Sequence, residues 1–371
     1  MVPRIDVAPL LGPASAARDA VDGAVLAAAA GTGFMVVRGL PAGPPLDAAT
    51  RARLLSILSL PGEATRPLWR RKFEPANPNV YRGWFPLQHG ERTHKEGIDI
   101  GPDIARPGAV ASGDPLREAT PLPREDALPG WRAAACAYYL AMEEAGRALM
   151  RSIARGLGLQ EGHFDPSFAD GISTLRLIHY PARAPASLAG IAGIEAEGDA
   201  RARHLVGAPH VDSGFVTLLA QDGVDGLQAR ARDGAWIDVP PEEGGFAVNF
   251  GGVLERWTGG RIRATEHRVV GDGRARMSIP FFLEPAAEAT IAPLPLAGFP
   301  SFEPFAYGDH LWSAMTRFAP SRGRPAAPLP RGVNAASPTR PGPSHAAAAA
   351  ASGGRETDVV ACCRARCPGA S

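Results

Sequence analysis

The sequence predicts a mainly β fold, an antiparallel sandwich or barrel, with helices packed against it. From Thr174 onward, short strand-like runs such as "TLRLIHY", "FVTLLAQ" and "RMSIPFFLE" follow one another, separated by Gly, Asp and Pro. Closely spaced strands with turn residues between them are typical of antiparallel sandwiches and barrels. A long amphipathic helix precedes these strands. The 371 residues, 45% of them hydrophobic, are enough for one large domain or two.

Residues 1–110 are predicted to form an N-terminal mixed α/β region. A short strand pattern at "RIDVAPL" is followed by a helix over Ala14–Ala30, a buried strand over Phe34–Val37 and a second helix over 47–60. Gly39 ends the buried strand. The stretch "NPNVYRGWFPLQHGERTHKEGIDIGPD" has aromatic, basic and glycine residues but no clear period, so we predict a loop-rich segment there.

The strongest predicted helix runs from Trp131 to about Arg155. Apolar residues recur every three or four positions, at Tyr138, Met142, Ala145, Leu149, Ile153 and Leu157. This spacing places them on one face, and Gly156 and Gly158 close the pattern. We expect the helix to pack on a sheet as a scaffold. Together with the strands after Thr174 it defines a predicted core over residues 111–318.

Two segments are predicted to be irregular. The stretch between Tyr180 and Pro209 carries small and charged residues, and we expect part of it to be a mobile loop. Residues 319–371 consist mainly of Pro, Ala, Gly, Ser and Arg, with almost no large apolar side chains. Such a segment cannot bury enough apolar surface to offset its ordering entropy, so we predict a disordered tail.

Charge and composition narrow the class of protein. The chain has 39 basic and 38 acidic residues, and the basic ones are spread out, so we expect neither a nucleic-acid nor a membrane partner. The uncharged run Gly23–Val37 is too short for a spanning helix and has the wrong flanks for a signal peptide. Three of the four cysteines lie in the last ten residues, which argues against a disulfide framework. We expect a cytoplasmic monomer.

A candidate metal site lies just before a buried strand. In "GAPHVDSGFVTLLAQDG", His210 and Asp212 are two positions apart, and residues at this spacing in a strand point to the same face. His267, in the strand-like "RATEHRVV", is a candidate third ligand. Two imidazoles and one carboxylate form the facial triad of non-haem Fe(II) oxygenases, which leaves coordination positions open for oxygen chemistry.

A candidate anion site follows on the next strand. Arg276 and Ser278 in "RMS" alternate and so share a face. A guanidinium with a hydroxyl is a good receptor for a buried carboxylate, because charge-assisted bidentate bonds offset its desolvation. Tyr180 in "IHYP" offers a phenol to the same anion. The alternatives are a structural salt bridge for Arg276 and simple packing for Tyr180.

Taken together, these residues resemble the isopenicillin N synthase-like family of Fe(II)/2-oxoglutarate-dependent oxygenases. The likeness runs over most of residues 3–318, in collinear order, through "RIDVAPL", "GTGFMVVRGLP", "RLIHYP", "HVD", "GLQAR", "WIDVP", "VNFG", "HRVV" and "RMSIPFFLEP". It implies a double-stranded β-helix (jelly roll) core backed by helices. It also implies that the triad binds Fe(II), and that Arg276 and Ser278, assisted by Tyr180, bind the distal carboxylate of 2-oxoglutarate.

The resemblance implies an enzyme that uses Fe(II), 2-oxoglutarate and O2 to hydroxylate, desaturate or cyclise a small molecule, with release of succinate and CO2. Because loops on a rigid scaffold carry specificity, we expect substrate contacts in the loop around residue 81 and beside the metal. The candidates are Tyr81, Arg82, Trp84, Phe215 and Phe282. A solvated loop with anchoring aromatic residues accounts for the loop around residue 81 equally well.

Two other functions stay open at the level of sequence. The first is an iron oxidase of the same family that does not consume 2-oxoglutarate, as isopenicillin N synthase itself keeps the Arg-x-Ser motif without using that cosubstrate. The second is a non-catalytic ligand-binding protein on this fold, although the chain keeps all three metal-ligand positions. A zinc hydrolase is disfavoured because HExxH and HxxEH spacings are absent.

Overall fold

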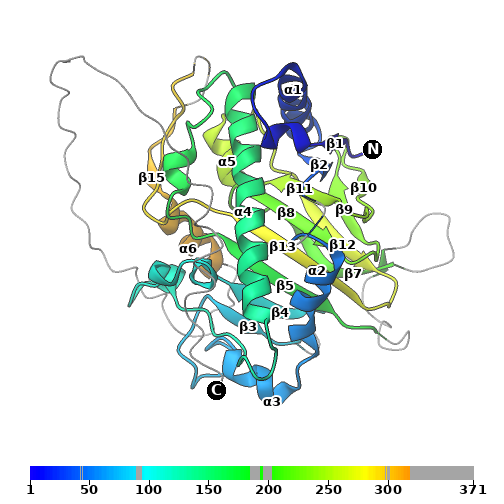
Figure 1. The fold of residues 1–371 in the computed structure, drawn as a ribbon. Helices are drawn as coiled ribbons and strands as arrows, with labels where there is room; N and C mark the ends of the chain where they lie inside the picture. Colours follow the sequence, from blue (N-terminus) through cyan, green and yellow to red (C-terminus); the bar gives the residue numbers. More distant parts are fainter. Residues whose placement is uncertain are drawn as a thin grey trace. The chain divides into compact units, whose positions relative to one another are not determined.

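The computed structural model describes residues 1–41, 43, 45–88, 94–183, 193–194, 203–296, 298 and 301–317 (Figure 1). The chain divides into one unit over residues 1–322 and a second over residues 323–371. The second unit and the predicted tail lie outside the described residues, as does most of the predicted loop after Tyr180. None of the helices in the described part is long and apolar enough to cross a membrane.

The main sheet has eight strands, in the order β1-β2-β11-β8-β13-β5-β4-β3. Their bounds are β1 (Arg4–Asp6), β2 (Phe34–Arg38), β3 (Gly83–Phe85), β4 (Glu96–Ile100), β5 (Thr174–Tyr180), β8 (Val216–Gln221), β11 (Phe246–Phe250) and β13 (Arg276–Leu283). All neighbouring pairs are antiparallel except β1 and β2. The predicted N-terminal region therefore contributes β1 to β4 to the same sheet as the core strands.

A second sheet has the order β10-β9-β12-β7-β6, and all its pairs are antiparallel. Its strands are β6 (Gly193–Ile194), β7 (Arg203–His210), β9 (Leu227–Arg230), β10 (Trp236–Asp238) and β12 (His267–Gly271). A small hairpin pairs β14 (Thr290–Ile291) with β15 (Phe305–Ala306). The two large sheets form the predicted double-stranded β-helix, and Phe34, Ile178, Leu227 and Val269 pack together between them.

Strand alternation separates the two faces of the main sheet. On β13, Ile279, Phe281 and Leu283 belong to the core on the helix side. Arg276 and Ser278 therefore point to the opposite side, toward the interior between the sheets. The sequence pattern predicted this shared face of Arg276 and Ser278, and the strand bounds confirm that both lie on one strand.

The helices are α1 (Ala16–Gly31), α2 (Ala48–Leu55), α3 (Gly62–Thr65), α4 (Trp131–Gly156), α5 (Gly252–Trp257) and α6 (Tyr307–Arg317). Short 3₁₀ turns occur at Ala8–Leu11, Ser56–Ser59, Arg66–Leu68, Pro102–Ile104, Pro107–Ala109, Pro115–Arg117 and Asp165–Phe168. The helix predicted over 47–60 thus ends as an α-helix at Leu55 and continues as a 3₁₀ turn.

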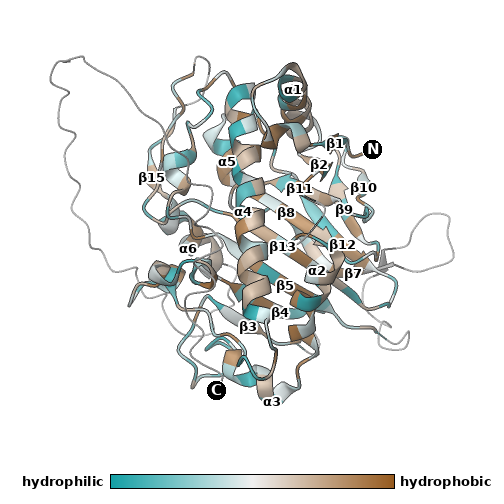
Figure 2. Cartoon of the chain, viewed as in Figure 1, coloured by the Kyte–Doolittle hydropathy of each residue, from teal (hydrophilic) through white to brown (hydrophobic). Residues whose placement is uncertain are grey.

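Helix α4 lies along the outer face of the main sheet, as predicted (Figure 1). Its apolar residues Tyr138, Met142 and Ile153 are fully buried in the core that it shares with the sheet, and brown hydrophobic positions run along the helix in Figure 2. Gly146 lies within this helix because β13 approaches it closely. A Cβ there would stand 3.1 Å from a methyl carbon of Leu283. The helix holds β13, and hence Arg276, in place from behind.

Candidate active site

The structure brings His210, Asp212 and His267 together at one edge of the second sheet. His210 ends β7, and its antiparallel partner on β12 is His267. Asp212 Oδ1 lies 3.6 Å from His210 Nε2 and 3.8 Å from His267 Nε2. One potential ligand atom from each residue lies within 4.8 Å of the other two. This spacing fits three ligands of a single metal ion.

Asp212 reaches this position from a turn and not from a strand. β7 ends at His210 and β8 begins at Val216, so strand alternation does not explain why Asp212 faces the histidines. The turn is held by the start of α5, where the amide of Gly252 donates to the Asp212 carbonyl (2.8 Å). The two segments approach so closely that a Cβ on Gly251 would lie 2.3 Å from the Gly214 carbonyl oxygen, which requires glycine.

Hydrogen bonds to the other polar atoms of the triad leave three atoms open for a metal. His210 Nδ1 donates to the Ala208 carbonyl (2.8 Å), and His267 Nδ1 donates to the Thr265 carbonyl (3.1 Å). Each imidazole therefore presents its lone pair at Nε2. Asp212 Oδ2 accepts bonds from Thr217 Oγ1 (2.6 Å) and Asn249 Nδ2 (2.7 Å), which leaves Oδ1 facing the two Nε2 atoms.

The electrostatics of His210 and Asp212 favour the protonation states that metal binding needs. Burial and the neighbouring His267 lower the pKa of His210 below its usual value, so its neutral imidazole is favoured. Burial alone would raise the pKa of Asp212, but the two imidazoles and the two hydrogen bonds outweigh it and lower that pKa. Neutral imidazoles and an ionised carboxylate are the donor set of an open Fe(II) site, so the residues present fit iron.

Arg276, Ser278 and Tyr180 form a second polar cluster inside the sandwich. Arg276 lies directly opposite Tyr180 across β13 and β5, and its guanidinium stands 5.3 Å from the centre of that ring. Its Nη2 donates to Gln221 Oε1 (3.1 Å), while its buried Nε has no hydrogen-bond partner. Ser278 is buried opposite Gln221. An arginine that is 3% exposed and lacks an acidic partner among the described residues has the free donor group that a buried anion needs.

A cavity of about 270 Å³ adjoins the triad and contains three of the five predicted substrate residues. Its lining comprises Tyr81, Thr174, Arg176, His210, Val211, Asp212, Ser213, Gly214, Phe215, Val216, Thr217, Phe282, Glu284, Leu311, Ala314 and Met315. Tyr81, Phe215 and Phe282 thus border the same space as His210 and Asp212.

Arg82 and Trp84, in contrast, do not line this cavity. Trp84 is the middle residue of β3 and points to the helix side, where it is 2% exposed in the core. Arg82 is fully buried and donates to Thr174 Oγ1 and to the Ile172 carbonyl (2.8 Å). Arg82 supports the cavity wall through Thr174, whereas Trp84 packs in the core. Neither position fits the sequence expectation that these residues contact substrate.

The sequence prediction missed two acidic residues near the cavity. Asp99, on β4, binds Arg70 and Arg176 at once, and burial would raise its pKa, but the two guanidiniums lower it to about 2. Glu284 follows β13 and lines the cavity; its Oε1 accepts a bond from the Tyr307 hydroxyl (3.1 Å). Burial raises the pKa of Glu284 to about 7. Glu284 shares the alternation of Arg276, Ser278 and Phe282, a signal that was available in the sequence.

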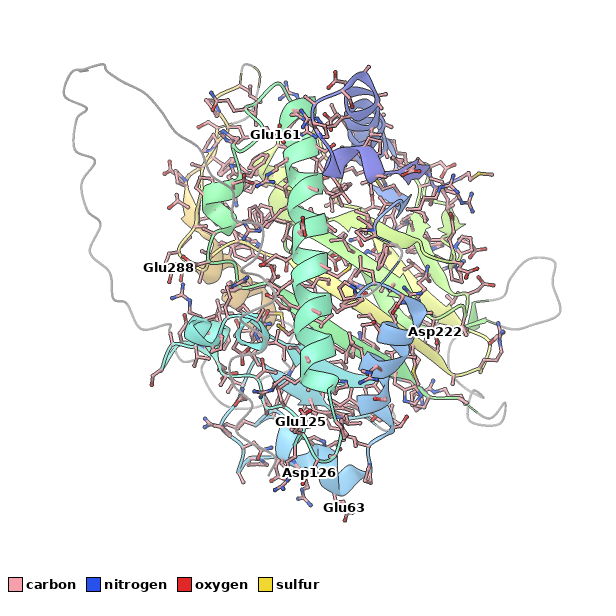
Figure 3. The ribbon with its side chains drawn as sticks, viewed as in Figure 1. Glu63, Glu125, Asp126, Glu161, Asp222 and Glu288 are labelled. Atoms are coloured by element: carbon pink, nitrogen blue, oxygen red, sulfur yellow. The ribbon has the colours of Figure 1, made fainter. Side chains whose placement is uncertain are left out.

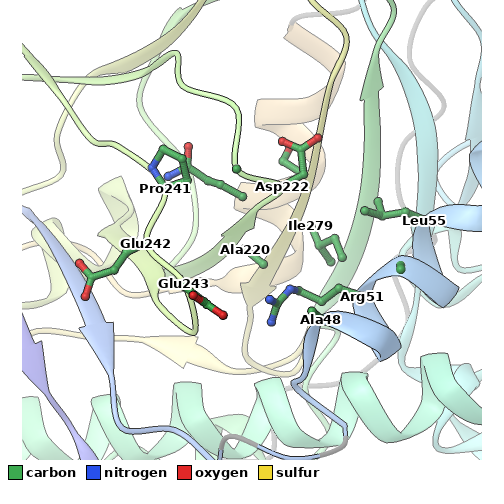
Figure 4. Close-up of a pocket in the computed structure, with 13 residues that line it drawn as sticks. Ala48, Arg51, Leu55, Ala220, Asp222, Pro241, Glu242, Glu243 and Ile279 are labelled. Atoms are coloured by element: carbon green, nitrogen blue, oxygen red, sulfur yellow. The ribbon is translucent and has the colours of Figure 1, made fainter.

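A second cavity, of about 430 Å³, lies away from the triad. It is bordered by Ala48, Arg51 and Leu55 of α2, by the end of β8 at Ala220–Asp222 and by the Pro241–Glu243 segment (Figure 4). Ser278 also borders it, but none of the three triad residues does. The chemistry expected at the triad therefore belongs to the smaller cavity.

Comparison with known proteins identifies the family. The family model for the 2OG-Fe(II) oxygenase superfamily matches residues 175–285, which include the triad and Arg276. Isopenicillin N synthase of Streptomyces clavuligerus is 29% identical over 331 residues, or 87% of this chain and 97% of that protein. A 2-oxoglutarate-dependent dioxygenase of Dothideomycetidae sp. is 31% identical over 252 residues, or 60% of this chain and 68% of that protein.

A solved structure agrees in fold. A full-length Neurospora crassa protein in complex with alpha-KG (2-oxoglutarate) has a TM-score of 0.72 and 25% identity, covering 85% of this chain and 96% of that one. The same protein has a structure in complex with alpha-KG and 5-formyluracil, with a TM-score of 0.70 and 26% identity over the same shares of both chains. The chain belongs to the 2OG-Fe(II) oxygenase superfamily, as an isopenicillin N synthase-like member of a family whose cofactors are Fe(II), 2-oxoglutarate and O2.

Proposed function

We propose that the chain is a dioxygenase that oxidises a small molecule while 2-oxoglutarate is converted to succinate and CO2. The observation that carries the proposal is the separation of two receptors. Three open donor atoms of His210, Asp212 and His267 converge beside a cavity. Arg276, the anion receptor, lies in the sandwich interior and is not among the residues that line this cavity. The triad and its cavity suit a metal ion with a substrate beside it. Arg276 suits the carboxylate of a cosubstrate.

In this proposal, His210 Nε2, His267 Nε2 and Asp212 Oδ1 hold the iron. These three protein ligands would leave coordination positions free, and the iron that they hold would supply the redox chemistry of the oxidation. The Ala208 and Thr265 carbonyls fix the imidazole orientations, and Thr217 and Asn249 fix the carboxylate. Such supporting bonds keep the donor atoms at their positions before metal arrives.

Arg276 binds the distal carboxylate of 2-oxoglutarate, with help from Ser278 and Tyr180. The unpartnered Nε of Arg276 and the buried hydroxyl of Ser278 are the donors that such an anion needs. The cavity beside the triad binds the molecule to be oxidised. Its volume of about 270 Å³ suits a small molecule, and the apolar side chains of Phe215, Phe282 and Leu311 exclude water from the reacting groups.

The second candidate is an oxidase that does not consume 2-oxoglutarate. It is favoured by the match to isopenicillin N synthase, which extends over 97% of that protein. Because the Arg-x-Ser motif is common to both kinds of enzyme, only the fate of 2-oxoglutarate separates them. Hydroxylation, desaturation and ring closure are all open to a site of this kind.

The test is to follow O2 uptake and succinate release by the Fe(II)-loaded protein with 2-oxoglutarate and a panel of small molecules. We expect substrate-stimulated succinate release in equal amounts with CO2, and its loss in Asp212→Ala. The matched control is Asp126→Ala, because Asp126 is an exposed carboxylate at the periphery (Figure 3). Stimulated O2 uptake without succinate would establish the oxidase, and near-native turnover of iron-loaded Asp212→Ala would refute the ligand assignment.

A further inference from the structure

The cavity beside the triad has a second polar feature, the carboxyl group of Glu284. Glu284 lies directly after β13, at the position that shares its face with Phe282. It is close to the turn that carries Asp212, because a Cβ added to Gly214 would stand 3.3 Å from Glu284 Oε1. Glu284, Asp212 and His210 all border the same space. A molecule held for oxidation at the triad therefore lies within reach of this carboxyl group.

The two carboxyl oxygens of Glu284 differ in their hydrogen bonding. Oε1 accepts a hydrogen bond from the Tyr307 hydroxyl of α6 (3.1 Å). Oε2 is buried and has no hydrogen-bond partner among the described residues. The whole residue is only 6% exposed, so bulk water does not replace the missing donor. A buried acceptor without a donor is costly, and native proteins keep few of them unless a ligand or an ordered water completes the bond.

The two nearby arginines do not bind Oε2, although Arg82 Nε is itself without a hydrogen-bond partner among the described residues. Arg82 directs Nη1 to Thr174 and Nη2 to the Ile172 carbonyl. Its Nε lies beside Gly101, where an added Cβ would stand 3.0 Å from it. Arg176 binds Asp99 through Nε and Nη2. These cations lower the pKa of Glu284 from a distance, but in the described part of the chain neither forms a hydrogen bond or ion pair with Oε2. A bound ligand can therefore supply the missing donor.

The remaining walls limit the kind of molecule that can bring this donor. Phe215, Phe282, Leu311 and Met315 line the cavity with apolar surface. Burial, more than any neighbouring charge, determines the raised pKa of Glu284. A carboxylate of a ligand placed against Oε2 would add a second acceptor, and a second negative charge whenever Glu284 is ionised, which is unfavourable in a buried site.

We propose that Glu284 is a substrate-recognition residue whose Oε2 accepts a hydrogen bond from an N–H or O–H group on a small, largely apolar substrate. The inference rests on the proposed function, since it takes this cavity as the substrate site. It narrows the substrate class to molecules that carry a hydrogen-bond donor on an apolar body, and it excludes molecules that would place a carboxylate at this end. Tyr307 is a positioning residue, because its hydroxyl holds Oε1 and so fixes the orientation of the carboxyl group.

The test uses matched probe pairs that differ by one methyl group: indole with 1-methylindole, 2-quinolone with N-methyl-2-quinolone, and phenol with anisole. Dissociation constants are measured anaerobically by calorimetry on the protein loaded with Fe(II) and 2-oxoglutarate. The titrations are made at about pH 8, above the pKa of Glu284 of about 7, so that the carboxylate is ionised. In the wild type, the member with a free N–H or O–H is then expected to bind at least about tenfold more tightly, as one hydrogen bond to a charged acceptor predicts.

Glu284→Met removes the acceptor and keeps the length of the side chain, so the preference is expected to fall to about one. Glu284→Gln leaves one oxygen for two donors, Tyr307 and the probe, and serves if Glu284→Met does not fold; its preference is expected to fall at least about threefold. Glu288→Gln is the matched control, since Glu288 is exposed four positions along the chain and lies at the periphery (Figure 3). It should keep the wild-type preference.

The outcomes separate this inference from the proposed function. Equal binding of both members, a preference that survives in Glu284→Met, or no binding of any probe by the wild type would each overturn the role of Glu284. Binding of 2-oxoglutarate is recorded in the same samples. Its loss from the wild type would count against the proposed function, whereas normal 2-oxoglutarate binding without the donor preference would count against the role of Glu284 alone.

Discussion

Asp99 and Glu284 are two buried carboxyl groups of the same unit, 1% and 6% exposed, yet their pKa values lie on opposite sides of the ordinary range. Asp99 binds Arg70 and Arg176, and although burial alone would raise its pKa, these cations lower it to about 2. For Glu284, burial prevails and raises the pKa to about 7, because its direct partner is the single hydroxyl of Tyr307. Burial acts in the same direction on both groups, so the difference between their pKa values comes from their partners.

The contrast distinguishes an acid that holds the fold from one that serves a ligand. Asp99 is saturated with donors and joins residues that are far apart in the chain, so its role is structural. Glu284 lines a cavity, and its Oε2 has no hydrogen-bond partner among the described residues. Asp212 combines both patterns in one carboxylate, since Thr217 and Asn249 saturate Oδ2 while Oδ1 faces the two imidazoles.

Removing the saturated acid should have the largest effect on stability. Asp99→Ala leaves Arg70 and Arg176 buried without their partner, and breaking a buried pair in this way costs about 3–5 kcal/mol of unfolding free energy. Urea denaturation measures the loss. Asp126→Ala, which removes an exposed partner of Arg124, is the control and should be indistinguishable from the wild type. An Asp99→Ala protein of unchanged stability would show that the ion pairs do not hold the sheet.

Replacing the open acid should instead change how stability depends on pH. Because the folded pKa of Glu284 is about 7 against an ordinary 4.5, the folded state keeps a proton that the unfolded state has lost in this window. Its contribution to stability is complete below pH 4.5 and is lost as pH rises through about 7. Glu284→Gln lacks this loss, so its stability relative to the wild type should increase by about 3 kcal/mol between pH 4.5 and pH 8.

Urea denaturation of both proteins across this pH range gives the comparison. The groups that act on Glu284 are Arg82, Tyr307, Arg176 and Asp99, and all four stay in place in the variant. A difference in stability between the two proteins that does not vary with pH would contradict the raised pKa of Glu284. Its carboxyl group would then not differ from that of Asp99 in the way described.

The smallest expected effect concerns the saturated oxygen of Asp212. Thr217→Val removes one hydrogen bond to a charged group, about 1.5–3 kcal/mol, and should weaken iron binding roughly tenfold or more without abolishing it. Equilibrium titration with Fe(II) under anaerobic conditions measures this change. Thr290→Val, at an exposed position of β14, should bind iron like the wild type. Iron affinity unchanged in Thr217→Val would mean that Asn249 alone suffices to hold the carboxylate.

Local patterns in the sequence predicted the helix α4, the strands of the jelly roll and the residues of the triad. They succeeded where a single strand or helix decides the outcome, as for Arg276 and Ser278 on one face of β13. They predicted that His210 and Asp212 face the same way, but on the assumption that both lie in a strand. Asp212 lies instead in a turn that is held by the start of α5. That contact joins residues about 40 positions apart, and no local period encodes it.

The lining of the proposed substrate cavity was predicted only in part, for a similar reason. Tyr81, Phe215 and Phe282 line it, whereas Arg82 turns to the Ile172 carbonyl and Trp84 to the helix side of β3. Which of two adjacent residues faces a cavity depends on how a short strand joins the sheet. The difference between Asp99 and Glu284 depends on partners as distant as Arg70 and Tyr307, which sequence spacing does not reveal.

The central claim is that the triad binds iron while Arg276 separately binds 2-oxoglutarate, and an anaerobic titration of the Fe(II)-loaded protein with 2-oxoglutarate tests it most directly. We expect the wild type to develop a visible charge-transfer band. Arg276→Ala should bind the same amount of iron but require a 2-oxoglutarate concentration higher by roughly two orders of magnitude or more. Arg274→Ala, at an exposed arginine two positions earlier, should match the wild type. An unchanged 2-oxoglutarate affinity in Arg276→Ala would contradict the account.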